Sequence, residues 1–347
     1  MHPLFQDEKK LIGGMFGLHV DKDEKSHRPV FINEESIYMV NARSCIWFLL
    51  GHLKPRKVWC PSYLCRTIIE AIRTANVQPD FYEVDFNLRI NSPNWIDCIN
   101  EDDIVLFINY FGFSSEFRFF EQVKNQGAWI LEDASQSLLT TRTYPFADFT
   151  IYSPRKFIGI PDGGIINIHS DIKLNDQEYK SIPPVWWQKA LSASVLRREF
   201  DKCGGMRDWF AIFQEIEPGA PIGPFSMSEL SKFILENNID YTSIAQKRRE
   251  NYQYLLDNLK HIALFPSLPN DIVPLGFPVY LKERDKFRQV LFDHNIYPPV
   301  HWKLLDLVPL QFGESHKLAS EIMTLPCDQR YDLQDMDRMA QILFDAY

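Results

Sequence analysis

A mostly parallel α/β sheet flanked by helices, followed by a smaller α+β domain, is the fold class that the sequence predicts. Two observations indicate it. Between residues 38 and 170, short apolar runs alternate with amphipathic stretches, a spacing typical of doubly wound parallel sheets. From residue 239 onwards, a long amphipathic stretch comes first, and a strand-like run and two further helix-like stretches follow it.

The individual elements follow from the same periodicities. The expected strands of the large domain are 38–40, 58–59, 81–84, 104–109, 128–132, 149–152 and 165–168. Helices are expected at 42–50, 64–75 and 116–126, the first capped by Asn41 and stopped by Gly51. In the C-terminal part we expect helices at 239–259, 284–294 and 335–347 and a strand at 273–281.

These elements divide the chain into three parts. Residues 1–37 form an N-terminal arm, 38–238 a large α/β domain and 239–347 a small α+β domain. Within the large domain, residues 171–225 contain several prolines, the pair Trp186-Trp187 and Cys203-Gly204-Gly205. This composition predicts an irregular segment with one or two helices.

Composition excludes several classes of protein. The chain has 347 residues, 45% of them hydrophobic, and a net charge of -9. An acidic chain is a poor general binder of nucleic acid, since phosphate backbones require a basic face. No apolar run approaches membrane-spanning length, and the first ten residues lack the apolar core of a signal peptide. We therefore expect a soluble, cytoplasmic protein that binds neither nucleic acid nor membranes.

The six cysteines show no metal-binding or disulfide pattern. None forms a CxxC pair, and the Cys60/Cys65 spacing has no matching second cluster. In a cytoplasmic protein we expect them to be buried thiols, with neither a disulfide framework nor a metal site.

The candidate chemistry is concentrated in residues 128–168. Asp133 follows an apolar run and is expected at the carboxyl end of a strand, where open α/β sheets bind ligands. Lys156 follows the next apolar run and precedes the turn Asp162-Gly163-Gly164. A lysine can form an imine with a carbonyl, and an aspartate can hold a proton on a pyridine nitrogen. The pair therefore indicates a pyridoxal-phosphate (PLP) site, with Lys156 and Asp133 catalytic.

Each of these residues also has an ordinary explanation. A lysine after a strand is usually a solvated surface charge, and an aspartate there commonly caps the next helix. Glu132 is the weaker carboxylate, because it is expected to point to the other face of the sheet.

Other residues are candidates for the coenzyme's remaining groups. Gln136 is positioned to reach the ring's phenolic oxygen from the first turn after Asp133. Arg43 and Ser44 open a helix whose N-terminus favours a phosphate. Ser153 is a further phosphate donor. Alternatively, Gln136 is an exposed helical residue, Asn41 merely caps the helix and Ser153 caps a turn.

Together these motifs resemble the DegT/DnrJ/StrS family of fold-type-I PLP-dependent aminotransferases, whose best-known members aminate nucleotide-linked keto sugars. The segments that carry the resemblance run from residue 36 to the C-terminus: NARSC, PSYLCRTII, INYFGF, LEDASQS, SPRKFIGIPDGG, IAQKRRENYQYL and NIYPPVHW. The Lys, Asp and Gln motifs are specific and the flanking ones looser.

The resemblance implies a role for each matching residue. Lys156 would be the Schiff-base lysine, Asp133 the partner of the pyridinium and Gln136 a contact of the ring hydroxyl. Arg43 and Ser44 would bind phosphate, and Tyr63 or Cys65 would lie near the ring face. By the same resemblance, Asn109, His301 and Trp302 are candidates for substrate contacts, although Trp302 is more typical of a core or interface aromatic. A homodimer with active sites near the subunit interface is implied as well.

Two departures concern phosphate binding. Ile151 stands where the family often has a phosphate-binding serine, so Ser153 is the expected substitute. Pro224 and Ser226 replace the Asn and Arg of a segment that, in the family, reaches the partner's coenzyme. The cofactor assignment is therefore firmer than that of the substrate.

The function expected from the sequence is transfer of an amino group from an amino acid, glutamate by preference, to a keto sugar that is nucleotide-linked. The alternatives are a PLP enzyme of the same fold with a non-sugar substrate or a lyase-type reaction, and a non-catalytic binding protein of this fold.

Overall fold

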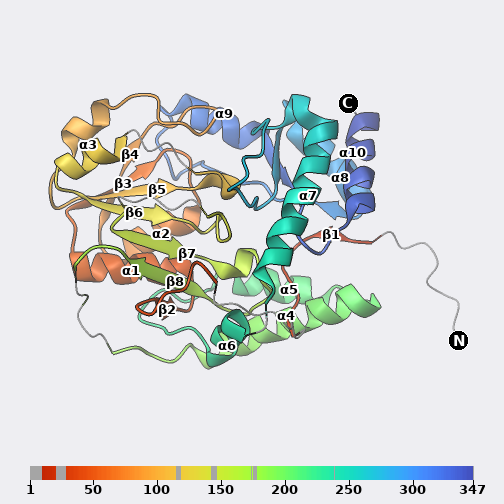
Figure 1. Cartoon of the computed structure of the whole chain (residues 1–347), viewed down its shortest axis with the longest axis horizontal. Coiled ribbons are helices and arrows are strands. Elements are labelled where there is room, and N and C mark those ends of the chain that lie inside the picture. The colour runs from red at the N-terminus through yellow and green to blue at the C-terminus, as the bar shows by residue number, and fades with distance from the viewer. Residues whose placement is uncertain are drawn as a thin grey trace, which may run out of the picture.

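A seven-stranded mixed sheet forms the centre of the computed structural model, which describes residues 10–20, 29–114, 119–141, 147–172, 174, 178–237 and 239–346. Figure 1 shows this sheet on the side of the molecule away from the C-terminus. In spatial order the strands are β2 (Ile37–Met39), β8 (Gly164–Ile168), β7 (Phe149–Tyr152), β6 (Trp129–Asp133), β5 (Ile104–Ile108), β3 (Lys57–Pro61) and β4 (Gln78–Tyr82). All seven match runs expected from the sequence.

The sheet is mostly parallel, as expected. Strands β4, β3, β5, β6 and β7 pair in parallel, whereas β8 and β2 add two antiparallel pairs. Every residue of β5 is buried, because layers cover both faces of a parallel sheet. In the register of the central strands, Asp133 lies beside Ile108 on one side and Ile151 on the other. The carboxyl ends of β5, β6 and β7 therefore meet at one edge.

The connecting helices correct one detail of the prediction. Helix α1 (Ala42–Leu53) continues through Gly51 and ends at Lys54 in the left-handed region. A helical glycine costs only about 1 kcal/mol, which the burial of Leu49 and Leu50 in the core offsets. Helix α2 (Arg66–Thr74) lies within its expected range, and α3 (Phe120–Asn125) begins after residues 115–118, which are outside the described ranges.

Residues 178–237 contain the helices that lie between the large sheet and the C-terminal part of the sequence. These helices are α4 (Pro184–Cys203) and α5 (Asp208–Ile216), which pack on each other, and then α6 (Glu229–Asn237). Figure 1 shows α4, α5 and α6 together beside the β2 end of the sheet. The segment 171–225 thus contains two helices, within the expected one or two, and α6 follows it.

The C-terminal part has its own apolar core. Strands β9 (Phe277–Tyr280) and β11 (Ile322–Leu325) pair in antiparallel fashion. Helices α7 (Tyr241–Leu259), α8 (Arg284–Asp293) and α10 (Leu333–Ala346) correspond to the three expected ones, and α9 (Gly313–Glu321) precedes β11. The domain boundaries at residues 38 and 239 stay predictions.

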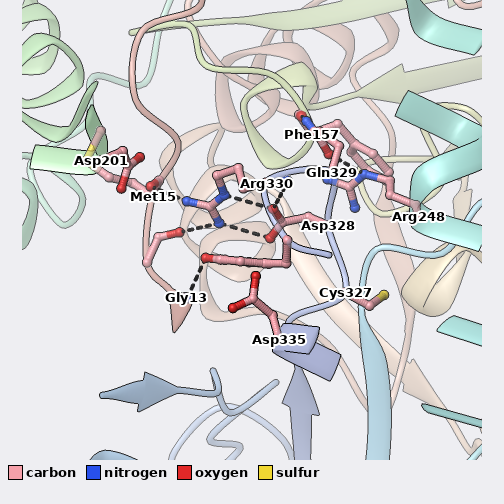
Figure 2. A network of polar contacts seen from close by, with 12 residues as sticks. Gly13, Met15, Phe157, Asp201, Arg248, Cys327, Asp328, Gln329, Arg330 and Asp335 are labelled. Carbon is pink, nitrogen blue, oxygen red and sulfur yellow. Dashed lines mark hydrogen bonds and ion pairs between the residues drawn. The ribbon is translucent and has the colours of Figure 1, made fainter. Parts of the chain in front are cut away.

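Residues 12–15 of the N-terminal arm are joined to this C-terminal part, whereas Leu18 and His19 bond to the backbone of the large domain. Strand β1 (Ile12–Gly13) pairs in parallel with β10 (Ile296–Tyr297). Arg330 forms an ion pair with Asp328 and donates to the backbone carbonyls of Gly14 and Met15 (Figure 2). This short part of the arm therefore packs on the C-terminal part of the chain. Segments 1–9 and 21–28 of the arm lie outside the described residues.

Two further expectations concern membranes and cysteines. Within the described ranges, no helix has both the length and the apolarity needed to cross a bilayer. Cys45, Cys60 and Cys327 are buried thiols, as expected, but Cys98 and Cys203 are exposed. Cys98 ends the short 3-10 turn η1 (Asn94–Cys98) and Cys203 ends α4, and the spacing of the cysteines in the sequence does not reveal these exposed ends.

Candidate active site

A cavity of about 160 Å³ lies at the edge where β5, β6 and β7 end. Asp133 is the last residue of β6, and Lys156 closes the short 3-10 turn η4 (Pro154–Lys156) that follows β7. Because β6 and β7 are parallel neighbours, the two strand ends present both side chains to the same cavity. Of the other residues singled out in the sequence, the cavity lining includes Arg43, Cys65, Gln136, Ser153, His301 and Trp302.

The segment after Asp133 turns twice and forms no helix, contrary to expectation. Asp133 Oδ1 accepts a hydrogen bond of 2.9 Å from the Ser135 amide, which starts the first turn. This turn buries Gln136, whose Oε1 accepts from the Phe111 amide at 2.7 Å. Gln136 Nε2 is buried and has no hydrogen-bond partner among the described residues. Buried donors are normally hydrogen-bonded, so a ligand in the cavity that offers an acceptor would satisfy Gln136 Nε2.

The backbone of η4 holds Lys156 beside the cavity. The Lys156 amide donates to the Ser153 carbonyl at 3.1 Å, and the Phe157 amide donates to Pro154 at 2.9 Å. Within the described part of the chain, no hydrogen bond or ion pair engages the Lys156 amine. A lysine amine with no protein partner at a strand end is available to react with a carbonyl.

His301 also lines the cavity, and its imidazole is neutral at physiological pH. Burial, together with the nearby Lys156 ammonium, lowers the pKa of His301 to about 3. Its Nδ1 lies 2.8 Å from the hydroxyl oxygen of Thr324 on β11. The C-terminal part of the chain thus supplies an uncharged hydrogen-bonding group, with Trp302 next to it in the lining.

The N-terminus of α1 forms another part of the lining. Asn41 caps the helix, since its Oδ1 accepts from the Ser44 amide at 2.9 Å and its Nδ2 donates to Pro221 at 2.9 Å. Gly164 passes so close that a Cβ there would lie 2.3 Å from the Asn41 carbonyl carbon. The Asp162-Gly163-Gly164 turn is therefore what lets β8 approach the start of the helix.

Three expected contacts lie outside the lining. The Ser44 hydroxyl donates to the Pro221 carbonyl at 3.3 Å, so it faces the neighbouring loop. Tyr63 is fully buried and packs on Trp302, with ring centroids 5.4 Å apart. Asn109 donates to Glu132 Oε1 at 2.6 Å on the other face of the sheet. Cys65, the alternative to Tyr63, does line the cavity and accepts from the Thr67 hydroxyl.

Glu132 points away from the cavity, as its alternation with Asp133 predicts. Besides Asn109, it accepts from the Thr150 hydroxyl at 2.9 Å, and that hydroxyl lies 2.9 Å from His169 Nε2. Burial raises the pKa of Glu132 to about 7, against the opposing effect of these hydrogen bonds. The carboxylates of Glu132 and Asp133 thus have different surroundings on the two faces of β6.

Sequence analysis missed Arg155 and Glu217, which both line the cavity. Glu217 follows α5 and accepts from Arg155 Nη2 at 2.8 Å and from Arg43 Nη2 at 3.1 Å. The position of Arg155 directly before Lys156 could have identified it as a candidate from the sequence. No sequence pattern marks Glu217, because the packing of α4 and α5 brings that segment to the sheet.

Comparison with known proteins identifies the fold. The sequence matches no family model and no curated protein. Among solved structures, it is similar to S. venezuelae DesV in complex with a ketimine intermediate, at 15% identity and a TM-score of 0.67 over 91% of this chain and 85% of that one.

Two further matches are similar in extent. A DegT DnrJ EryC1 StrS aminotransferase from Brucella abortus has 16% identity and a TM-score of 0.64, over 90% of this chain and 86% of that one. Spr1654 from Streptococcus pneumoniae, a proposed sugar aminotransferase, in its PLP form has 15% identity and a TM-score of 0.65, over 90% and 88%.

At these sequence identities, the similarity is one of backbone fold. It extends over nearly the whole length of this chain. It confirms, at the level of the fold, the resemblance that the motifs indicate. The chain has the fold of the DegT/DnrJ/StrS aminotransferases, the fold-type-I architecture of PLP-dependent transferases.

Proposed function

We propose that this protein is a PLP-dependent aminotransferase that transfers an amino group from an amino acid, glutamate by preference, to a nucleotide-linked keto sugar. The observation that carries the proposal is the meeting of Lys156, Asp133 and Gln136 at one cavity. The three structures compared above, an aminotransferase and a proposed sugar aminotransferase among them, support the reaction class by their fold.

The residues at the cavity fit the coenzyme. Gln136 Nε2 is a buried donor without a described partner, which suits the phenolic oxygen of a pyridoxal ring. Among the described residues, the Asp133 side chain accepts only a backbone hydrogen bond at Oδ1, so its carboxylate is available to a ring nitrogen. The Arg43 and Arg155 side chains and the N-terminus of α1 provide positive charge for a phosphate.

When bound, pyridoxal phosphate supplies an aldehyde that condenses with amines and a ring that accepts the electrons of a developing carbanion. Lys156 would hold the coenzyme through Nζ, and its amine would move the proton at the substrate's α-carbon. Asp133 would hold the proton on the ring nitrogen. Ile108 and Trp302 give the cavity apolar lining that limits access of water.

A donor panel tests the reaction class. Protein loaded with pyridoxal phosphate is mixed with single amino acids, and pyridoxamine phosphate is measured by chromatography. We expect glutamate to convert the coenzyme and a nucleotide-linked keto sugar to restore it. If no donor converts the coenzyme, the protein is not an aminotransferase. If only non-sugar acceptors restore it, the proposed substrate is wrong, an outcome that Pro224 and Ser226 make worth testing.

The proposal includes a homodimer. Several apolar side chains on or between α4 and α5 are exposed, a pattern typical of a subunit interface. They are Val185, Val195, Leu196, Met206 and Phe210. Light scattering on the purified protein should give twice the mass of 40.7 kDa. A monomer at all concentrations would contradict this part of the proposal.

A further inference from the structure

The carboxylate of Glu217 lies between two arginines that come from different parts of the chain. Arg155 Nη2, on the turn of Lys156, donates to Oε2 at 2.8 Å. Arg43 Nη2, in the first turn of α1, donates to Oε1 at 3.1 Å and to the Glu217 backbone carbonyl at 2.9 Å. Arg43 also has Glu70 at 3.9 Å, outside the cavity lining.

This arrangement places an anion at the cavity. Arg155 above all, and Arg43 with it, lowers the pKa of Glu217, so the carboxylate is ionised at neutral pH. Arg43 is only 7% exposed, and a guanidinium buried to that degree requires an anionic partner. In the Glu217 carboxylate, each of the two oxygens pairs with a different guanidinium. A phosphate group can pair with the two guanidinium groups in the same way.

We propose that Arg43 and Arg155 form the subsite for the coenzyme's phosphate group, and that the Glu217 carboxylate occupies this subsite until phosphate displaces it. The inference rests on the proposed function for the identity of the phosphate carrier. The pairing itself, and its place in the cavity lining beside Lys156 and Asp133, are independent of that function.

The charges at the cavity favour displacement over coexistence. The lining contains the cationic side chains of Arg43, Arg155 and Lys156 and the carboxylates of Asp133 and Glu217. A phosphate dianion next to an ionised Glu217 would meet like charge at close range, which is unfavourable in a half-buried site. With the guanidinium groups released from Glu217, the same dianion meets two cations and the amide groups at the start of α1.

A second structural feature supports a ligand in this cavity. Gln136, 2% exposed, lines the same cavity, and its Nε2 has no hydrogen-bond partner in the part of the chain that the structure describes. The cavity therefore has an unsatisfied donor as well as a cationic pair whose anion comes from the protein itself. A molecule with both a phosphate and a hydrogen-bond acceptor would satisfy both features at once.

Affinity measurements test the displacement. The dissociation constants of inorganic phosphate and of pyridoxal 5′-phosphate are measured by calorimetry for the wild type and for Glu217→Gln. Removal of the competing charge should tighten both by about tenfold, which corresponds to about 1.4 kcal/mol. Glu217→Asp, which keeps the charge but has a shorter reach, should give a smaller gain. Arg155→Met should weaken both ligands but leave binding of pyridoxal, which lacks the phosphate, nearly unchanged.

The matched control is Glu215→Gln on α5. Glu215 is exposed and pairs with Lys189 away from the cavity. The affinities of the Glu215→Gln variant for phosphate and pyridoxal 5′-phosphate should therefore equal those of the wild type. Phosphate binding to Glu217→Gln and Glu217→Asp that is no tighter than in the wild type would overturn the displacement.

The two proposals fail separately. If Lys156 forms no adduct with pyridoxal but inorganic phosphate still responds to Glu217→Gln, the coenzyme proposal fails and the subsite stands. If the adduct forms and the variants at Glu217 and Arg155 do not change phosphate affinity, the subsite is wrong.

Discussion

Gln329 Nε2 donates a hydrogen bond of 2.6 Å to the backbone carbonyl of Phe157, the residue directly after Lys156. Gln329 Oε1 accepts from Arg248 Nε at 2.8 Å, and the Arg248 guanidinium lies 4.3 Å from the centroid of the Phe157 ring. Figure 2 shows these three residues next to the Asp328–Arg330 ion pair. Gln329 and Arg248, both from the C-terminal part of the chain, thus hold the turn that carries the reactive lysine.

The first prediction concerns this contact. Gln329→Ala removes the donor to Phe157 and leaves Arg248 Nε without its acceptor, so we expect a loss of about 1–2 kcal/mol in the free energy of unfolding. The looser turn should also slow adduct formation at Lys156. Urea unfolding and the rate of pyridoxal-phosphate uptake measure the two effects. Gln334→Ala, on the exposed side of α10, is the control, and equal values for both variants would refute the link.

A second prediction concerns Asp133. Asp133→Asn keeps the shape and the hydrogen bond from Ser135 but removes the charge that holds a proton on the ring nitrogen. The rate of coenzyme conversion by glutamate should fall by about 100-fold or more, while Lys156 still reacts with pyridoxal phosphate. Single-turnover kinetics measure the rate. An unchanged rate would remove Asp133 from the chemistry.

Gln136 gives a third prediction. Gln136→Leu removes the buried donor together with the acceptor of the Phe111 amide, whereas Gln136→Glu keeps an acceptor for that amide and removes the donor. Both variants should bind pyridoxal phosphate about tenfold or more weakly, because the phenolic oxygen loses its partner. Fluorescence titration measures the affinity. If Gln136→Glu binds pyridoxal phosphate as tightly as the wild type, the Nε2 group of Gln136 does not contact the coenzyme.

A fourth prediction follows from the pKa of Glu132, which burial raises from its ordinary 4.5 to about 7. Between these values the folded chain binds more protons than the unfolded chain, so stability falls as pH rises from about 4.5 to 7. Glu132→Gln cannot ionise and retains an acceptor for Asn109. It should therefore lack this pH dependence and gain about 1–3 kcal/mol over the wild type at alkaline pH. Urea unfolding across the pH range measures it, and parallel curves for the two proteins would contradict the prediction.

The fold and the centre of the site could be predicted from the sequence for definite physical reasons. Buried parallel strands must be apolar throughout, so β5, β6 and β7 stand out, and a polar residue directly after such a run lies at the ligand-binding edge. That rule finds Asp133. The turn of Lys156 follows β7 in the same way, and strict alternation separates Glu132 from Asp133.

The rest depends on contacts between distant segments. Ser44 was expected to bind phosphate, but the loop at Pro221 takes its hydroxyl, and no local pattern reveals that pairing. Tyr63 packs on Trp302, and it is Trp302, from a distant part of the chain, that lines the cavity. Glu217 approaches Arg155 for a similar reason, through the packing of α4 and α5.

The central claim is that Lys156 binds the coenzyme covalently. Protein mixed with pyridoxal 5′-phosphate is reduced with borohydride and digested, and the peptides are analysed by mass spectrometry. The account predicts a single major adduct, on Lys156, that is absent from Lys156→Ala and present in the control Lys189→Ala, whose lysine is exposed on α4. A wild-type adduct on another lysine, or an equal yield from Lys156→Ala, would contradict the account.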